Sequence, residues 1–517
     1  MNINFLNLLS VDFLLSLPRY RFVQLVVSTY VVNYRKETMA YVWLIISLLI
    51  FSVGVVIAIL TYAGMLLSLE IERGQRDPAS VFEYDLREQL VLLKQIRQVI
   101  IILSAIGFLG AALYWLVHDT LLQGFAMEWL NLVIRWVHVV AGIMWIGASF
   151  YFIFLENNLN RTENIRDELA GNLWAIHGGG FYFLEKYKMA PKELPKDLHW
   201  FKYEAYFTWL SGFALLVVVY YMDANAFLID PQKANITSTQ AILISVGSLV
   251  LGWIIYDSMC KSSLINNAML FALTGLVLLA GFAFFFLQIF NSRAAYIHVG
   301  ALIGTLMAWN VYFVIIPSQK SLVRAAVTRQ PLDPLLGKKA GERSLHNNYF
   351  TLPVIFIMIS NHFPSTFGHQ YNWIILVGVS LASAGIKHYW NLRDRGEKSR
   401  WILPVSVTGL ISLALITSPA FDRFDEKAAP VTFAEVNAIF TVRCIQCHST
   451  TPTSQQWVTA PNGVKFDTPE QIVQMKEKIM VRAVLTNSMP QGNVTNMTQG
   501  ERDTIKAWIL QGAKIQD

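Results

Sequence analysis

The sequence has few charged residues and very little cysteine. Only 15% of its 517 residues are Asp, Glu, Lys or Arg, against roughly 25% in an average soluble protein. Together with 54% hydrophobic residues and a mean hydropathy of +0.42, this scarcity excludes a disordered, fibrous or ordinary cytosolic protein. The three cysteines, Cys260, Cys444 and Cys447, are too few and wrongly spaced for a disulfide scaffold.

The apolar residues fall in runs that are long enough to cross a lipid bilayer. A spanning helix needs about 20 mostly apolar residues, and about ten segments qualify by that length. We therefore predict an all-α, polytopic transmembrane helical bundle. The predicted spans are 41–66, 99–117, 129–155, 205–222, 240–258, 267–290, 294–317, 349–363, 372–390 and 402–418.

Loop charge predicts how the bundle is oriented. Connections 156–203, 318–348 and 391–401 are rich in Lys and Arg, whereas 223–239 and 363–371 carry almost none. The positive-inside rule makes the first set cytoplasmic, so the C-terminal region emerges on the opposite, outer face. The basic N-terminus fits this orientation poorly. It is either an interfacial amphipathic helix or an additional marginal span.

The net charge of +6 belongs to the membrane part of the chain. Residues 422–517 carry ten basic and ten acidic side chains, so the C-terminal region is neutral. A basic surplus confined to a membrane protein's loops is typical of cytoplasmic loop charge, and it gives no support for nucleic-acid binding.

The composition changes near residue 420 to that of a small soluble domain. We predict three helices in it, near 432–441, 469–485 and 498–511. The expected organisation is an N-terminal extension with two spans, an eight-helix membrane domain, a linker and a small all-α domain, in the order 1–126, 127–418, 419–430 and 431–517.

A Cys-x-x-Cys-His motif, Cys444 to His448, opens the C-terminal domain. This is the attachment motif for c-type haem. Two thiols on one helical turn reach the two vinyl groups, while the adjacent imidazole points at the iron from the same side. A zinc site needs two more ligands nearby, and a thioredoxin-like pair needs a βαβ context. The sequence offers neither, so it predicts one covalent haem c in a class I-type cytochrome c domain.

A methionine some tens of residues later is expected as the sixth iron ligand. Met475 and Met480 lie at helical spacing in an amphipathic run, which favours core packing, and Met497 is a further methionine. Met489 lies in an irregular segment where a loop can bring its thioether to the iron, and we predict it as the axial partner of His448. A His/Met pair suits electron transfer rather than oxygen binding.

Three histidines lie toward the outer leaflet in the predicted topology: His138, His298 and His362. Ionisable groups inside a membrane are functional candidates by default, and a shared additional haem or metal site is one interpretation. The alternative is that each neutral imidazole hydrogen-bonds a neighbouring helix.

Three cations lie near or within predicted spans: Arg135, Arg293 and Lys387. They could neutralise an anionic substrate, although interfacial snorkelling is the commoner explanation. Position alone makes Arg135, with the three histidines, the catalytic candidates.

Several aromatic-rich strings resemble a known family. They are RWVHVVAGIMWIGASFYFIFLENNL at 135–159, HGGGFYFLEKY at 177–187, LHWFKYEAYFTWLSG at 198–212 and SLHNNYFTLPVIFIMISNHFP at 344–364. Followed by a C-terminal Cys-x-x-Cys-His domain, they resemble the bacterial membrane-bound urate oxidase (urate hydroxylase) family. The resemblance covers roughly 127–517, and residues 1–126 fall outside it.

The resemblance implies a membrane oxidoreductase of purine metabolism and urate degradation. Urate would be oxidised to 5-hydroxyisourate in the bacterial inner membrane. The electrons would leave through a periplasmic haem c to a periplasmic cytochrome or terminal oxidase. The family supplies no catalytic residues that can be carried over. Two alternatives stay open: another quinol- or cytochrome c-linked respiratory oxidoreductase, and a non-enzymatic, membrane-anchored electron-transfer subunit.

Overall fold

Long apolar runs form the helices of the membrane part, as their composition requires in a medium without water. The computed structural model describes residue 98 and residues 122–515, except 192, 196, 419–428, 455, 456 and 458. The two spans expected at 41–66 and 99–117 lie outside the described residues.

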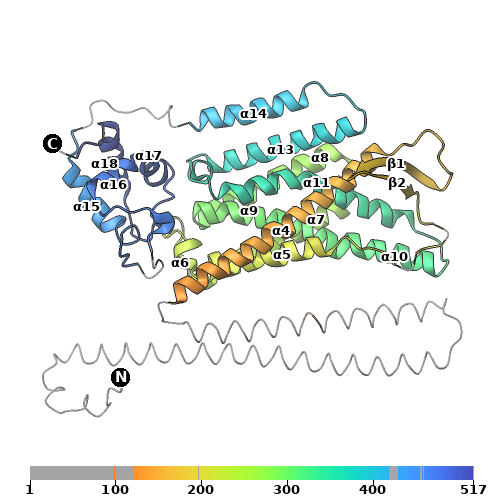
Figure 1. Ribbon diagram of the computed structural model, residues 1–517, viewed down its shortest axis with the longest axis horizontal. Coiled ribbons are helices and arrows are strands. Elements are labelled where there is room, and N and C mark those ends of the chain that lie inside the picture. The colour runs from red at the N-terminus through yellow and green to blue at the C-terminus, as the bar shows by residue number, and fades with distance from the viewer. Residues whose placement is uncertain are drawn as a thin grey trace, which may run out of the picture. The chain divides into compact units, whose positions relative to one another are not determined.

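Each of the eight spans predicted after residue 127 corresponds to helical structure (Figure 1). The helices are α4 (Leu122–Asn158), α5 (Tyr203–Leu216) continued by the π-helix η2 (Val217–Tyr221), α7 (Ser238–Lys261), α8 (Ala268–Ile289), α9 (Ser292–Trp309) continued by η4 (Asn310–Ile315) and α10 (Ile316–Val327), α11 (Pro334–Ser360), α13 (Asn372–Asp394) and α14 (Ile402–Ile416).

Five helices of the described part of the chain are long and apolar enough to cross a membrane. They are Phe125–Asn158, Tyr203–Tyr221, Ser238–Lys261, Ala268–Ile289 and Ser292–Val327, while Ile402–Ile416 is shorter but apolar. The protein is therefore mostly helical and suited to membrane association, and the total of about ten spans stays a prediction.

Helix α11 differs from the sequence expectation because it extends well beyond its apolar half. It begins at Pro334, with Asp333 as the N-cap whose carboxylate accepts from the Leu335 amide, and it runs through a polar first half. The prediction at 349–363 found only the apolar second half. Hydropathy cannot detect a polar helical extension, whereas the Asp-Pro start is a helix N-terminal signal.

A β-hairpin corrects the all-α expectation. Strands β1 (Leu169–His177) and β2 (Gly180–Tyr187) pair antiparallel. Gly178 and Gly179 have φ of +57° and +80° between them, and two successive positive φ values are what a tight hairpin turn needs. The aromatic and β-branched residues that flank the three glycines pair as strands.

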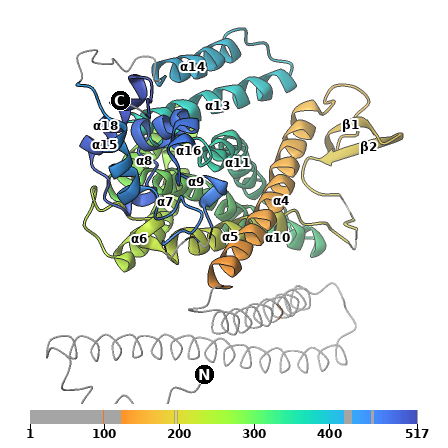
Figure 2. The ribbon, with the colours of Figure 1, turned by 60° about the vertical axis from the view of Figure 1, so that its left-hand side comes forward.

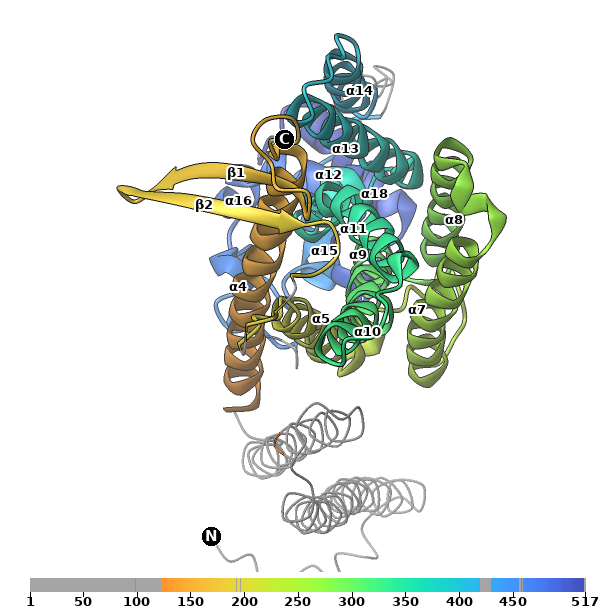
Figure 3. The same ribbon diagram turned by 90° about the vertical axis from the view of Figure 1, so that its right-hand side faces the viewer.

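Helix α9 lies at the centre of the bundle. Figure 3 shows α5, α7, α8 and α11 around it, and each of these helices contacts it. Most of its side chains are buried, including Tyr296, His298 and Met307. Close approach depends on Gly300, because a Cβ there would lie 2.7 Å from Ile357 Cγ2 on α11.

The C-terminal domain has its own core beneath three Thr-capped helices: α15 (Phe433–Arg443), α16 (Pro469–Gln474) and α18 (Gln499–Leu510). The single helix expected at 469–485 is divided into α16, α17 (Lys476–Ile479) and the π-helix η7 (Met480–Leu485). Helix α18 packs on α15, and the Trp508 ring lies 5.8 Å from that of Phe433. Trp508 thus joins the first and last helices of this domain in one core.

Two short helices of the bundle contact this domain. They are α6 (Ala224–Phe227), which contacts the 3₁₀-helix η8 (Gln491–Asn493), and α12 (Pro364–Phe367), which contacts η7. Figure 2 shows α6 beside the C-terminal helices, with the β1–β2 hairpin at the other end of the bundle. Residues Gly124–Asp517 form one compact unit.

The close contact at Gly300 predicts a stability difference between two glycines of one helix. Gly300→Ala adds a methyl group against α11, and overpacking costs about 1–3 kcal/mol. Gly304→Ala, one turn later, meets no atom within 4 Å and gains up to about 1 kcal/mol of helix propensity. We expect a lower thermal unfolding midpoint in detergent for Gly300→Ala and an unchanged or higher one for Gly304→Ala. Equal midpoints would contradict the packing argument.

Candidate functional site

The two thiols and the imidazole of the Cys-x-x-Cys-His motif lie on one helical turn directly after α15. The amides of Cys447 and His448 both donate to the Cys444 carbonyl, at 3.2 and 2.9 Å. Neither thiol is in a disulfide. The local backbone therefore presents two free sulfurs and one ring in the order that a covalent haem needs.

A hydrogen bond fixes the orientation of the His448 ring. Its Nδ1 lies 3.0 Å from the Val464 carbonyl oxygen, so Nδ1 carries the proton and donates. This leaves the Nε2 lone pair available, which is how a second partner prepares a metal-binding histidine. Burial lowers the pKa of His448, while the Val464 carbonyl raises it. The ring is therefore neutral at pH 7, as an iron ligand must be.

The surroundings of Cys444 argue against the two other uses of such a motif. Burial, with the neighbouring Cys447, raises the pKa of the Cys444 thiol to about 12. A thioredoxin-like nucleophile needs a lowered thiol pKa instead. Among the residues that the structure describes, no three His, Cys, Asp or Glu side chains are arranged to hold a metal ion. The chemistry of the donor set thus fits thioether attachment better than a redox pair or a zinc site.

The four methionines of the domain occupy different environments. Met497 is fully buried in the core. Met475, between α16 and α17, and Met480, at the start of η7, are partly buried against that core, as core packing predicts. Met489 lies between η7 and η8, where its amide donates to the Arg482 carbonyl at 2.9 Å. Met489 is partly buried against the same core as Cys444, which fits a thioether on the second side of a haem.

The three histidines predicted to lie toward the outer leaflet do not share one environment. His298 is fully buried, and both of its ring nitrogens are occupied: Nδ1 donates to the Ala294 carbonyl at 2.7 Å, and Nε2 accepts from the Ser245 hydroxyl at 2.6 Å. His138 lies between α4 and α5, with Nδ1 3.0 Å from the Thr208 carbonyl. His298 therefore has a structural role, as the interhelical hydrogen-bond interpretation expects.

His362 lies just after α11 within a group of cations. Three arginines interact with it electrostatically: Arg135 from α4, Arg293 from the first turn of α9 and Arg482 from η7 of the C-terminal domain. In the described part of the chain, no carboxylate forms an ion pair with any of the three. Lys387 is elsewhere, with its ammonium 3.9 Å from the Phe150 ring. We call Arg135, Arg293, His362 and Arg482 the cationic cluster.

Two buried polar atoms of this region have no hydrogen-bond partner. They are Nε of Arg293, a donor, and Oδ1 of Asn361, an acceptor next to His362 in the chain. Roughly nine in ten buried polar groups, or more, have a hydrogen-bond partner, so each unpartnered atom needs an explanation. A planar anion with both acceptor and donor edges would satisfy both atoms. Asn361 and Arg482 were not predicted from sequence, because only the fold brings them to Arg135.

A second concavity lies at the hairpin end of the bundle. It encloses about 1420 Å³ and is lined by α4, α10, α11 and α13. Its charged residues are paired, for example Lys186 and Arg161 with Glu156. None of its lining residues comes from the C-terminal domain. The cationic cluster includes a residue of the C-terminal domain. It is therefore the stronger candidate for binding an anionic substrate that reacts beside the domain of the Cys-x-x-Cys-His motif.

The bundle matches a known protein family. Its residues 124–418 match the family described as urate oxidase N-terminal, which indicates an oxidoreductase-like enzyme with a role related to urate oxidation. Because the match spans more than half of the chain, the chain belongs to this family. The match ends before the Cys444–His448 motif. No curated protein and no solved structure matches the chain.

Proposed function

We propose that the protein is a membrane-bound oxidoreductase that oxidises urate to 5-hydroxyisourate and passes the electrons to a covalent haem c in its C-terminal domain. The observation that carries this proposal is the uncompensated cationic cluster. It combines side chains of the urate oxidase-related bundle with Arg482 of the domain that holds the Cys-x-x-Cys-His motif.

Urate suits the cationic cluster chemically. It is an anion at neutral pH, and its planar rings carry carbonyl acceptors and N–H donors. The guanidinium groups of Arg135 and Arg293 would bind its negative charge, and a free Nε–H on Arg293 would donate to a carbonyl oxygen. The unpartnered Asn361 Oδ1 would accept from a ring N–H. Water supplies the new hydroxyl oxygen while two electrons and two protons leave, and the electrons would pass to the haem one at a time. The His362 imidazole would accept one of the two protons, and the other would go to solvent water.

The C-terminal domain supplies the groups for the electron acceptor. Cys444 and Cys447 would form thioethers, and His448 Nε2 and Met489 Sδ would be the axial ligands. An iron held by imidazole and thioether supplies one-electron transfer rather than oxygen binding. The Val464 carbonyl keeps the His448 ring oriented for this role.

The membrane setting of this proposal rests on the five apolar helices and on the distribution of loop charge. With basic connections in the cytoplasm, the C-terminal domain faces the periplasm of a bacterial inner membrane. A periplasmic cytochrome or terminal oxidase would then take the electrons there.

Urate should reduce the haem of the purified full-length protein, followed by its absorption spectrum under anaerobic conditions. Reduction only by a quinol would instead support another respiratory oxidoreductase. Reduction only through an added protein partner would support an electron-transfer subunit. His448→Leu should remove the imidazole ligand and abolish urate-driven reduction, while the membrane part remains inserted.

Arg293→Gln should weaken urate binding about 10- to 100-fold, because a charge-assisted hydrogen bond contributes about 1.5–3 kcal/mol. Calorimetry on the full-length protein would measure this. The matched control is Arg166→Gln, which removes an exposed arginine at the hairpin that pairs with Glu185. Equal affinities of the two variants would exclude Arg293 from the substrate site.

Gly368→Ala tests electron delivery between the two domains. A Cβ at Gly368, at the end of α12, would lie 2.2 Å from the backbone oxygen of Thr486 in the C-terminal domain. Because a backbone atom cannot turn aside, the two surfaces must separate. We expect slower haem reduction by urate with an unchanged haem spectrum, measured by stopped-flow absorption. Gly281→Ala, which meets no atom within 4 Å, should keep the wild-type rate, and a wild-type rate for both would contradict the proposed route.

A further inference from the structure

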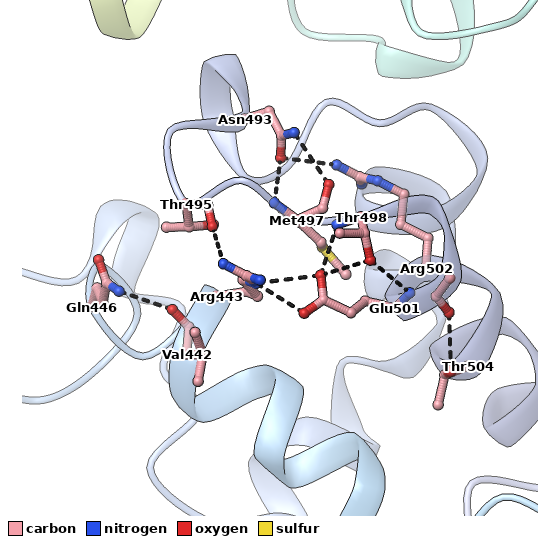
Figure 4. A network of polar contacts seen from close by, with 11 residues as sticks. Val442, Arg443, Gln446, Asn493, Thr495, Met497, Thr498, Glu501, Arg502 and Thr504 are labelled. Carbon is pink, nitrogen blue, oxygen red and sulfur yellow. Dashed lines mark hydrogen bonds and ion pairs between the residues drawn. The ribbon is translucent and has the colours of Figure 1, made fainter. Parts of the chain in front are cut away.

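Two arginines of the helices α15 and α18 make polar contacts to the segment 493–497 (Figure 4). Arg443 is the last residue of α15, and Arg502 lies in the first half of α18. Arg443 pairs with Glu501 at 3.0 Å and also donates to the Thr495 carbonyl. Arg443 therefore satisfies its charge with a carboxylate.

Arg502 is more deeply buried and has a different set of partners. Only 3% of the Arg502 surface is exposed to solvent. Nη1 donates to the carbonyls of Met489, at 2.7 Å, and of Ala483, and Nη2 lies 3.3 Å from Oδ1 of Asn493. In the described residues, no carboxylate forms an ion pair with Arg502. All three acceptors are uncharged oxygens.

These acceptors enclose one stretch of chain. Ala483 lies in η7, Met489 lies in the irregular segment, and Asn493 closes η8. Asn493 in turn receives the Met497 amide at 2.9 Å and donates to the Met497 carbonyl at 3.1 Å. One rigid guanidinium fork thus connects both ends of the Met489 segment with the Met489 backbone itself.

Burying a cation costs several kcal/mol, by rough estimate, and the charges of Glu501 and Asp230 offset part of this cost for Arg502 without forming an ion pair. Because Nη1 of Arg502 lies 2.7 Å from the Met489 carbonyl oxygen, its charge lies close to the proposed iron ligand. A fixed positive charge disfavours the more positive, oxidised form of a nearby redox group.

We propose that Arg502 is a positioning residue that holds Met489 in place as the sixth iron ligand, and that its buried charge favours the reduced haem. This inference rests on the proposed function, since it requires a haem c on Cys444 and Cys447. It assigns to Arg502 a role that neither the attachment motif nor the family match contains.

The test uses three variants of the full-length protein. Arg502→Gln removes both the fork and the charge, Arg502→Lys keeps the charge, and Arg443→Gln removes the other arginine of the network as a matched control. The readouts are the long-wavelength absorption band of Met-ligated ferric haem, carbon monoxide binding to the ferrous haem, and the reduction potential.

We expect Arg502→Gln to lose the band, to bind carbon monoxide and to shift the ratio of oxidised to reduced haem at least about tenfold toward the oxidised form, which is about 59 mV for one electron. Arg502→Lys should lose the band with a smaller shift. Arg443→Gln should keep the band and only lower stability.

Three outcomes would overturn the inference. A wild-type band and potential in both Arg502 variants would show that Met489 is held without the fork. Equal loss in Arg443→Gln would show general damage to the domain rather than positioning. If the Arg502→Gln protein does not accumulate, the absorption band, the carbon monoxide binding and the reduction potential of Arg502→Lys test the inference in its place. Haem missing from the wild-type protein would instead refute the proposed function, on which the inference stands.

Discussion

The close packing of α9 against α11 is the constraint on which the rest of the structure depends. Gly300 allows the two helices to approach, and one end of each helix carries or adjoins residues of the cationic cluster. Arg293 lies in the first turn of α9, and Asn361 and His362 follow the end of α11. The next residues form α12, which contacts the C-terminal domain. Interiors are dense and transmit displacement, so a shift at Gly300 would move the cationic cluster and the domain contact together.

The bundle treats two of its arginines, the buried Arg343 and the partly buried Arg293, in different ways. Arg343 of α11 is 2% exposed and is fully satisfied, with Asp257 at 2.6 Å and Asn310 at 3.0 Å. Arg293 has an unpartnered Nε and no carboxylate partner among the described residues. A protein that can pair a buried arginine so completely at one site has no stability reason to leave another unpaired. This contrast supports a ligand at Arg293 rather than a packing role, since unmet hydrogen bonds cost about 1–3 kcal/mol each.

Features that depend on one continuous segment of the chain were predictable from sequence. Features that depend on contacts between residues far apart in the chain were not. Apolar runs predicted helices such as α7 and α8, and the spacing of Cys444 and His448 predicted one turn presenting all three groups. Hydropathy did not predict the polar first half of α11. The tight turn of the hairpin was also not predicted from the run of three glycines. The roles of Arg502 and Asn361 depend on partners far away in the chain. The same holds for the contact of His298 with Ser245, which the depth of His298 in the predicted topology could not indicate.

Fusing the C-terminal domain to the bundle in one chain explains why the contact between them can be small. A covalent connection makes the second binding event intramolecular, which raises the effective concentration of each surface near the other. The contact then needs little affinity of its own, and the approach at Gly368 to Thr486 and at Gly492 to Ala226 serves proximity rather than binding energy. Glycine is the residue that permits such backbone-to-backbone approach. Glycines at these two positions therefore allow the closest approach of the two backbones, and the proposed electron transfer would use the short distance that results.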